Sequence, residues 1–151
     1  MEKLSHVNEQ GKVQMVDVGA KIPQLRIAKA SGRIMVAAAT IQLVTENKIK
    51  KGNVLTIAQI AGIQAAKQTA QLIPLCHPLQ ISKIDVDVSV DKDSILVISE
   101  VASIGQTGVE MEALTAVSAA LLTVYDMCKA VDKKMCIGEI KLLEKIKHDI
   151  K

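Results

Sequence analysis

Two ionisable side chains of opposite charge, Asp126 and Lys129, follow a long stretch from Ala113 to Tyr125 that carries no charged residue. A helix of this composition is covered by protein on most sides, and a spacing of three places the two side chains on one face. One interpretation is an exposed ion pair at the end of the helix. The other is an acid–base couple, in which partial burial lowers the lysine pKa and makes the ammonium a useful proton donor.

A thiol and an imidazole stand side by side in the segment LIPLCHPL, between Pro74 and Pro78. A zinc site needs about four ligands, so this pair alone is not expected to bind the metal. A catalytic cysteine is rarely next to its histidine in sequence, so a nucleophile–base pair is not expected either. Pro78 favours an extended backbone at His77, whereas Pro74 ends the preceding helix. The segment is either a structural connector or a rigid extended edge, residues 75–77, whose backbone and imidazole could hold a polar ring.

Other charged residues also have two interpretations each. Glu110 fits a capping box with Thr107, whereas Glu112 has no capping role and could be merely solvated. Lys51 precedes a glycine, so it lies either in a solvated loop or where the backbone lets a phosphate approach. Lys67 is the only charge in its predicted helix, which suggests that it faces an interface or a ligand.

The helices and strands that must position these side chains alternate along the chain. An antiparallel hairpin around residues 91–94 favours an α+β protein, and we expect a ferredoxin-like fold with the helices packed on one face of an antiparallel sheet. We expect one domain over residues 1–151, of which 1–24 form a polar N-terminal arm. Gly62 predicts a close helix contact, and Ser31-Gly32 predicts a turn. The predicted strands are 25–30, 84–90, 95–104 and 137–146, and the predicted helices are 38–50, 54–72 and 107–135.

The composition argues against several classes of protein. The 151 residues include no Trp or Phe and one Tyr, and the net charge is only +3. Nucleic-acid-binding modules need a basic bias or stacking aromatics, so we expect no nucleic-acid partner. The three cysteines form no CxxC pair, which is typical of free thiols in a reducing compartment. The polar N-terminus has no signal-peptide pattern, and no apolar run reaches about 20 residues, so we expect a cytoplasmic protein without a membrane partner.

Three segments together resemble the cyclic pyranopterin monophosphate synthases, the molybdenum cofactor biosynthesis protein C family: MVDVGAK, IAGIQAAKQTAQLIPLCHPL and TGVEMEALTAVSAALLTVYDMCKA. The resemblance runs from SHVNEQGKVQMVDV to IGEIKLLEK. It implies a lyase that converts (8S)-3′,8-cyclo-7,8-dihydroguanosine 5′-triphosphate into cyclic pyranopterin monophosphate and releases pyrophosphate. It also implies a homohexamer, a trimer of dimers with sites at subunit interfaces, and no cofactor, although Mg²⁺ could accompany the substrate triphosphate.

The same resemblance implies roles for individual residues. Catalytic roles fall on Asp126, Lys129 and Lys51. After LLEK the chain departs from the family's Gly-Gly-Lys-Ser-Gly segment, so that Asp149 replaces a lysine. Lys147 or Lys151 then substitutes for that lysine, or the tail does not close over the phosphates. Substrate-binding positions fall on Leu75, Cys76, His77, Met111, Glu112, Glu110, Lys67, Asp17, Lys21, Arg26 and Lys145.

Two alternatives remain open at this point. One is a catalytically idle scaffold of the same fold that retains affinity for a nucleotide, which the altered tail weakly favours. The other is an RNA-binding α+β module, which the missing aromatics and the mild charge oppose.

Overall fold

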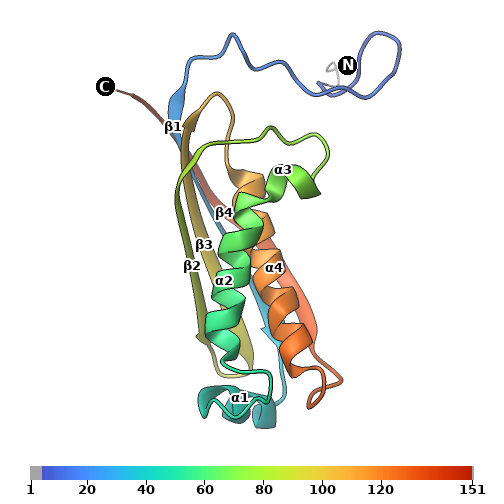
Figure 1. Cartoon of the computed structure of the whole chain (residues 1–151), viewed down its shortest axis with the longest axis vertical. Coiled ribbons are helices and arrows are strands. Elements are labelled where there is room, and N and C mark those ends of the chain that lie inside the picture. The colour runs from blue at the N-terminus through green and yellow to red at the C-terminus, as the bar shows by residue number, and fades with distance from the viewer. Residues whose placement is uncertain (1–4, 151) are drawn as a thin grey trace.

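The computed structural model describes residues 5–150 and has a four-stranded antiparallel sheet with helices on one face (Figure 1). The strand order is β2-β3-β1-β4. This order, with a helical segment after β1 and another after β3, is that of the ferredoxin-like fold, so the predicted fold class is confirmed. The elements are β1 (Gln24–Met35), α1 (Ala38–Thr45), α2 (Val54–Lys67), α3 (Thr69–Leu72), β2 (Ile81–Val90), β3 (Ser94–Gly105), α4 (Glu110–Cys128) and β4 (Cys136–Asp149).

An aliphatic core lies between the sheet and the two long helices. Val117, Leu121 and Val124 of α4 are fully buried, as are Ile34 of β1 and Val97 of β3. By length and mean hydropathy α4 could cross a membrane, but 56% of its apolar window is buried inside the protein. Burial of this extent is what a core helix requires, and it explains the long uncharged stretch that the sequence shows.

Glycines mark two close approaches in this core. The predicted turn at residues 31–32 is wrong, because β1 continues through it from Gln24 to Met35. A Cβ at Gly32 would come within 3.0 Å of side chains of α4 and β4, including Val117 and Leu121. A Cβ at Gly62 of α2 would lie 3.0 Å from a backbone oxygen of α4. The close helix contact predicted at Gly62 is therefore confirmed, whereas the glycine of β1 serves packing rather than a turn.

Both long helices are shorter than the sequence pattern suggests. The segment 54–72 is divided, because α2 ends at Lys67 and the short α3 begins at Thr69. The Thr69 hydroxyl donates hydrogen bonds to the carbonyl oxygens of Ala65 and Ala66 at 3.2 and 3.0 Å. These bonds satisfy the last carbonyls of α2 and allow the chain to change direction before Pro74.

Residues 5–23 form an arm across one end of the molecule (Figure 1). A single bridge between Val7 and Val13 closes a small loop in it, and the Asn8 side chain accepts backbone hydrogen bonds within that loop. The rest of the arm, to Pro23, has no strand partner.

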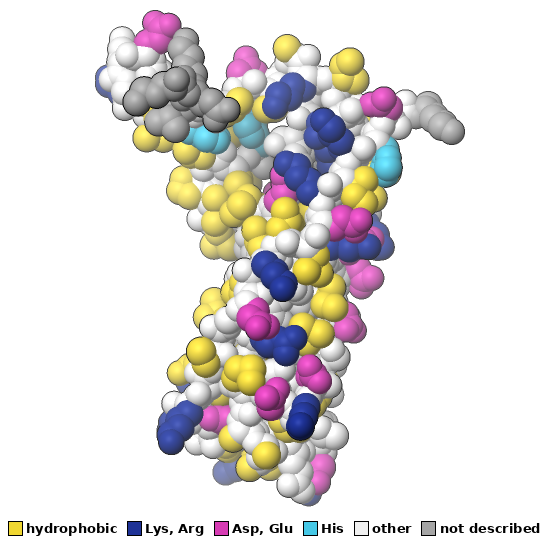
Figure 2. All heavy atoms as spheres, turned by 180° about the vertical axis from the view of Figure 1, so that it is seen from behind, with side chains coloured by type: hydrophobic (Ala, Val, Ile, Leu, Met, Phe, Trp, Pro, Cys, Tyr) yellow, Lys and Arg dark blue, Asp and Glu magenta, His cyan; other side chains and the backbone are white. Residues whose placement is uncertain are grey.

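Charged side chains cross the face of the sheet that the helices leave open. Lys29 of β1 contacts Glu100 of β3 and Glu144 of β4 at 3.2 and 3.3 Å, and Lys83 of β2 contacts Glu100 at 2.5 Å. Figure 2, which views the molecule from behind, shows basic and acidic side chains interspersed with hydrophobic ones. This surface carries charges of both signs together with hydrophobic side chains.

Candidate active site

A cavity of about 410 Å³ lies between the N-terminal arm, the segment after α3 and the start of α4. This volume is within the range of small-molecule sites. Figure 2 shows hydrophobic side chains gathered below the arm. The lining residues are Ser5, His6, Val16, Val18, Lys21, Leu75, Cys76, His77, Leu79, Thr107, Gly108, Glu110, Met111 and Glu112. Seven of them are predicted from the sequence: Lys21, Leu75, Cys76, His77, Glu110, Met111 and Glu112.

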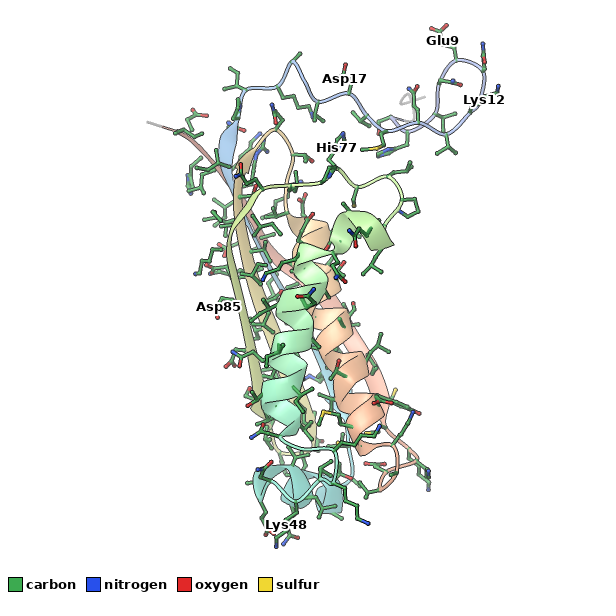
Figure 3. All side chains as sticks on the ribbon, in the orientation of Figure 1. Glu9, Lys12, Asp17, Lys48, His77 and Asp85 are labelled. Carbon is green, nitrogen blue, oxygen red and sulfur yellow. The ribbon has the colours of Figure 1, made fainter. Side chains whose placement is uncertain are left out.

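His77 links the wall of this cavity to the arm. Its Nε2 lies 2.7 Å from the carbonyl oxygen of Val16, and Figure 3 shows His77 below the part of the arm that carries Asp17. Because a carbonyl oxygen only accepts, Nε2 must carry the proton. In a neutral ring Nδ1 is then a hydrogen-bond acceptor.

Cys76 is a partly buried thiol rather than an activated nucleophile. Burial raises its pKa, and the nearby charges of Glu112 and Glu110 raise it further. A thiol with a raised pKa remains protonated and is a poor nucleophile. The backbone N–H of Cys76 donates to the carbonyl of Ile73 at 3.1 Å and closes a turn. Leu75 lies inside that turn, so the predicted extended edge begins at Cys76 instead.

Glu110 and Glu112 have different environments although both line the cavity. The predicted capping box is wrong: α4 begins at Glu110, Val109 is its N-cap and no side chain caps it. Glu110 instead forms an ion pair with Lys145 of β4. Glu112 is only 3% exposed, and burial raises its pKa. The cavity therefore contains one paired carboxylate and one poorly solvated carboxyl group.

The remaining predicted binding residues lie outside the cavity lining. Asp17 is exposed on the arm, where its carboxylate accepts a hydrogen bond from the Gly19 N–H at 2.8 Å. Lys67 is exposed at the end of α2. Arg26 of β1 donates through Nη2 to the carbonyl oxygen of Gln106 at 3.4 Å, and its buried Nε has no hydrogen-bond partner.

A second cluster of charged residues lies at the other end of α4. The carboxylate of Asp126 contacts the ammonium of Lys129 through Oδ1 and that of Lys51 through Oδ2, both at 2.8 Å. Lys51 also donates to the Asp126 carbonyl oxygen at 2.8 Å. The two lysines, Lys129 more than Lys51, lower the pKa of Asp126 to about 2.

Of the two interpretations of Asp126 and Lys129, the one with a lowered lysine pKa is wrong for the single chain. The Lys129 side chain is 55% exposed, and the Asp126 carboxylate raises its pKa. The hydrogen bond and the attraction to the carboxylate outweigh the desolvation that disfavours the charge, so the ammonium keeps its proton. The ion-pair interpretation of the spacing is therefore confirmed in this chain.

The cavity and this cluster do not meet within one chain. Glu110 and Asp126 are 16 positions apart on α4, which at 1.5 Å per residue is roughly 24 Å. Figure 1 shows the two ends of α4 far apart, one below the arm and the other near α1. The three predicted catalytic residues and the seven that line the cavity thus lie near opposite ends of one helix.

The C-terminal tail forms a strand rather than a loop. β4 pairs with β1 as far as Gln24 and Asp149, and the Gln24 side chain donates to Asp149 Oδ1 at 2.7 Å. Lys147 stands opposite Arg26, so the two side chains share one face of the sheet. Lys151, the other candidate replacement, lies outside the described residues.

Several lining residues were not selected from the sequence. Ser5 and His6 come from the arm, and Thr107 and Gly108 precede α4. No local pattern marks them, because the cavity forms only when the arm crosses the start of α4. Within residues 5–150, no three side chains of His, Cys, Asp or Glu lie close enough together to hold a metal ion.

Comparison with known proteins gives consistent matches along nearly the whole chain. The model of the MoaC family matches residues 15–148. The cyclic pyranopterin monophosphate synthase of Parvibaculum lavamentivorans is 53% identical over 146 residues, covering 95% of this chain and 91% of that protein. The protein of the same name from Thermomicrobium roseum is 52% identical, covering 96% and 89%. Molybdenum cofactor biosynthesis protein 1 of Drosophila melanogaster is 53% identical, covering 95% of this chain and 26% of that longer protein.

Proposed function

The chain belongs to the MoaC family, and we propose that it converts (8S)-3′,8-cyclo-7,8-dihydroguanosine 5′-triphosphate into cyclic pyranopterin monophosphate and pyrophosphate. It is a lyase of molybdenum cofactor biosynthesis. The observation that carries this conclusion is about 50% identity to cyclic pyranopterin monophosphate synthases over nearly the full length of both chains. The free thiols of the described residues support a reducing compartment, and we infer a cytoplasmic enzyme that binds neither nucleic acid nor membrane.

The cavity under the arm is the proposed site of the ring system. Its volume suits a bicyclic or tricyclic ring. The backbone of residues 75–77, Nδ1 of His77 and the carboxyl group of Glu112 offer acceptors and donors in its walls. A poorly solvated carboxyl group discriminates well between ligands. A ligand whose ring lacks the matching hydrogen-bonding group leaves the carboxyl group unpaired, and this weakens binding.

The Asp126 cluster is the proposed acid–base centre. Opening the purine-derived ring and rebuilding it as a pterin requires protons to move on and off nitrogen and oxygen. The side-chain nitrogens of Lys51 and Lys129 are held by one carboxylate. When the cyclic phosphate forms, pyrophosphate leaves, and two ammonium groups would stabilise the charge that develops on it.

Neither group of residues is sufficient alone, which is why we propose that each site is made by two copies of the chain. About 24 Å along α4 separates the cavity from the cluster, more than the substrate can bridge while reacting at one centre. The outer faces of α2 and α4 expose Ile60 and Leu122, at 60% and 62%, and part of Tyr125. Burial of such side chains favours assembly, and we propose a homohexamer built as a trimer of dimers.

The basic end of the sheet is the proposed triphosphate contact. Arg26 and Lys147 are cross-strand partners, and Lys145 lies two positions away on the same strand face. Lys147 is our proposed replacement for the family's lysine, because it keeps a cation next to Arg26 where Asp149 does not. We propose no resident cofactor; Mg²⁺ would enter with the triphosphate.

The test supplies the cyclic dihydroguanosine triphosphate to the purified full chain and measures pyrophosphate and pterin together. We expect both products in equal amounts. Binding of the substrate by calorimetry without either product would instead support the idle nucleotide-binding scaffold. Absence of both binding and turnover would contradict the proposed substrate.

A further inference from the structure

Asp132 is a buried carboxylate in the turn between α4 and β4. It is 6% exposed. Oδ2 accepts hydrogen bonds from the Ala37 N–H at 2.8 Å and from the Thr40 hydroxyl at 2.9 Å, while Oδ1 accepts one from the Lys134 N–H at 3.1 Å. The first two bonds join segments that are 95 and 92 positions apart in sequence. Both oxygens of the carboxylate thus have partners, on two segments that meet only in the fold.

Asp132 lies at the N-terminus of α1, which has no capping side chain of its own. The N-cap of α1 is Ala37, no local side chain caps the helix, and its first turn contains no acidic residue. A carboxylate at a helix N-terminus satisfies free N–H groups and complements the helix dipole. The Ala37 N–H is the main cause of the lowered pKa of Asp132, so the group is anionic at neutral pH. The start of α1 is therefore fixed to the turn after α4.

This connection joins the two segments that build the Asp126 cluster. Lys129 lies three positions before Asp132, and the chain leaving α1 reaches Lys51 after a short loop. The ion pair between Lys51 and Asp126 is exposed, with side-chain exposures of 47% and 57%. Exposed ion pairs hold geometry weakly, whereas a buried carboxylate with three hydrogen bonds holds it well.

We propose that Asp132 is the positioning residue of the Asp126–Lys51–Lys129 cluster, and that its bonds to Ala37 and Thr40 hold Lys51 against Asp126. The proposal rests on the proposed function for its kinetic consequence. Asp132 contacts neither the cavity nor the ammonium groups, so it acts through the placement of α1 and of the loop that follows. The cavity lies at the other end of α4, and its affinity for the ring does not depend on this connection.

The first test compares kcat and KM of the full chain with those of Asp132→Ala and Thr40→Val. A misplacement of about 1 Å costs up to about 10²-fold in rate, so we expect Asp132→Ala to lower kcat at least about tenfold and leave KM within about twofold. Thr40→Val removes one of the three bonds and should lower kcat less. An unchanged kcat in Asp132→Ala, or an effect on KM alone, would overturn the proposal.

A conservative variant and a matched control separate positioning from general stability. Asp132→Asn keeps an oxygen that can accept from Ala37 and Thr40, and should recover most of kcat. Ser99→Ala removes a buried hydrogen bond of 2.8 Å to the Ala113 carbonyl. It should lower the free energy of unfolding without lowering kcat. Equal loss of kcat in Asp132→Asn and Asp132→Ala, or an equal loss in Ser99→Ala, would contradict positioning.

A readout without turnover keeps the two proposals distinguishable. The rate of acylation of Lys51 is measured by mass spectrometry, with Lys92 in the β2–β3 turn as internal reference. In Asp132→Ala, release of Lys51 from Asp126 should raise the acylation rate of Lys51, relative to that of Lys92, about threefold. In Asp132→Asn this relative rate should stay near the wild-type value. A wild-type chain without turnover would count against the proposed function only. An unchanged Lys51 rate in folded Asp132→Ala would count against Asp132.

Discussion

Oδ2 of Asp126 lies 2.8 Å from Nζ of Lys51, across 75 positions of the sequence, while Oδ1 holds Lys129 at the same distance. Each carboxylate oxygen therefore has its own ammonium partner. The arrangement keeps the carboxylate anionic, with a pKa of about 2, and keeps two proton donors within reach of one point. One side chain thereby fixes the position of two potential acids.

Removal of either side of the Asp126–Lys129 pair should abolish most of the activity. Asp126→Asn and Lys129→Ala should each lower kcat by about 10²- to 10⁴-fold, the usual contribution of a positioned acid or base. Pre-steady-state and steady-state pterin formation measure this. Lys133→Ala, at an exposed position in the turn after α4, is the control and should keep the wild-type rate. Full activity in Lys129→Ala would mean that the site lies elsewhere.

The same carboxylate should make stability depend on pH in a defined window. Its pKa is lowered from 3.8 to about 2 in the folded chain, so its contribution is complete above pH 3.8 and is lost as pH falls through about 2. Urea unfolding should show wild type more stable than Asp126→Asn at pH 5, with a smaller difference at pH 2.5. A difference that is independent of pH would show that the ion pairs do not form in solution.

Glu112 should behave in the opposite way. Burial raises its pKa, so the ionised group costs stability in the folded state once pH rises above the usual 4.5. Glu112→Gln should therefore unfold at higher urea concentration than wild type at pH 7, and the gain should shrink towards pH 4. The same variant should bind the substrate more weakly, since stabilising substitutions at functional positions commonly cost activity. Lower stability at pH 7 would contradict the assignment of a poorly solvated carboxyl group.

Substitutions of Cys76 and of His77 should have very different effects on activity. Cys76→Ser should be mild, because the thiol is protonated and its backbone contributes more than its sulfur. His77→Ala removes the contact with the Val16 carbonyl and an acceptor in the cavity, and should lower kcat/KM by about tenfold or more, as one lost hydrogen bond of about 1–2 kcal/mol implies. A large loss from Cys76→Ser alone would reverse this ranking.

Local patterns in the sequence predict the elements but not the contacts between them. Sequence patterns predict the shared face of Asp126 and Lys129 and the period-two strand from Ile84 onward. Each of these patterns relates residues that lie within one helix or one strand. Lys51 was linked to Asp126 only through the family resemblance. The contact itself joins a loop and a helix 75 positions apart, and no local propensity encodes such a pairing.

The two wrong predictions, a turn and a capping box, have the same origin: contacts between elements. Ser31-Gly32 has the composition of a turn, yet packing of Val117 and Leu121 against Gly32 requires the glycine inside a strand. Thr107 and Glu110 have the spacing of a capping box, yet Glu110 forms an ion pair with Lys145 of β4. In both cases a tertiary partner overrides a local signal.

The separation of the cavity from the Asp126 cluster leads to a test by subunit mixing. His77→Ala damages the cavity and Asp126→Asn damages the cluster, so neither pure variant should turn over well. Co-expression with two tags should yield mixed assemblies in which about one quarter of the sites combine an intact cavity with an intact cluster. Activity near that fraction of wild type, measured on doubly tagged protein, is the expected result.

A matched mixture shows whether the restored activity comes from complementation. Asp126→Asn and Lys129→Ala both damage the cluster, which one chain supplies as a unit because all its contacts lie within that chain. Their mixture should therefore remain inactive. Activity in the His77→Ala mixture no higher than the sum of the separate variants would mean that one chain completes its own site. That outcome would require α4, or the arm above it, to bring two groups together across about 24 Å.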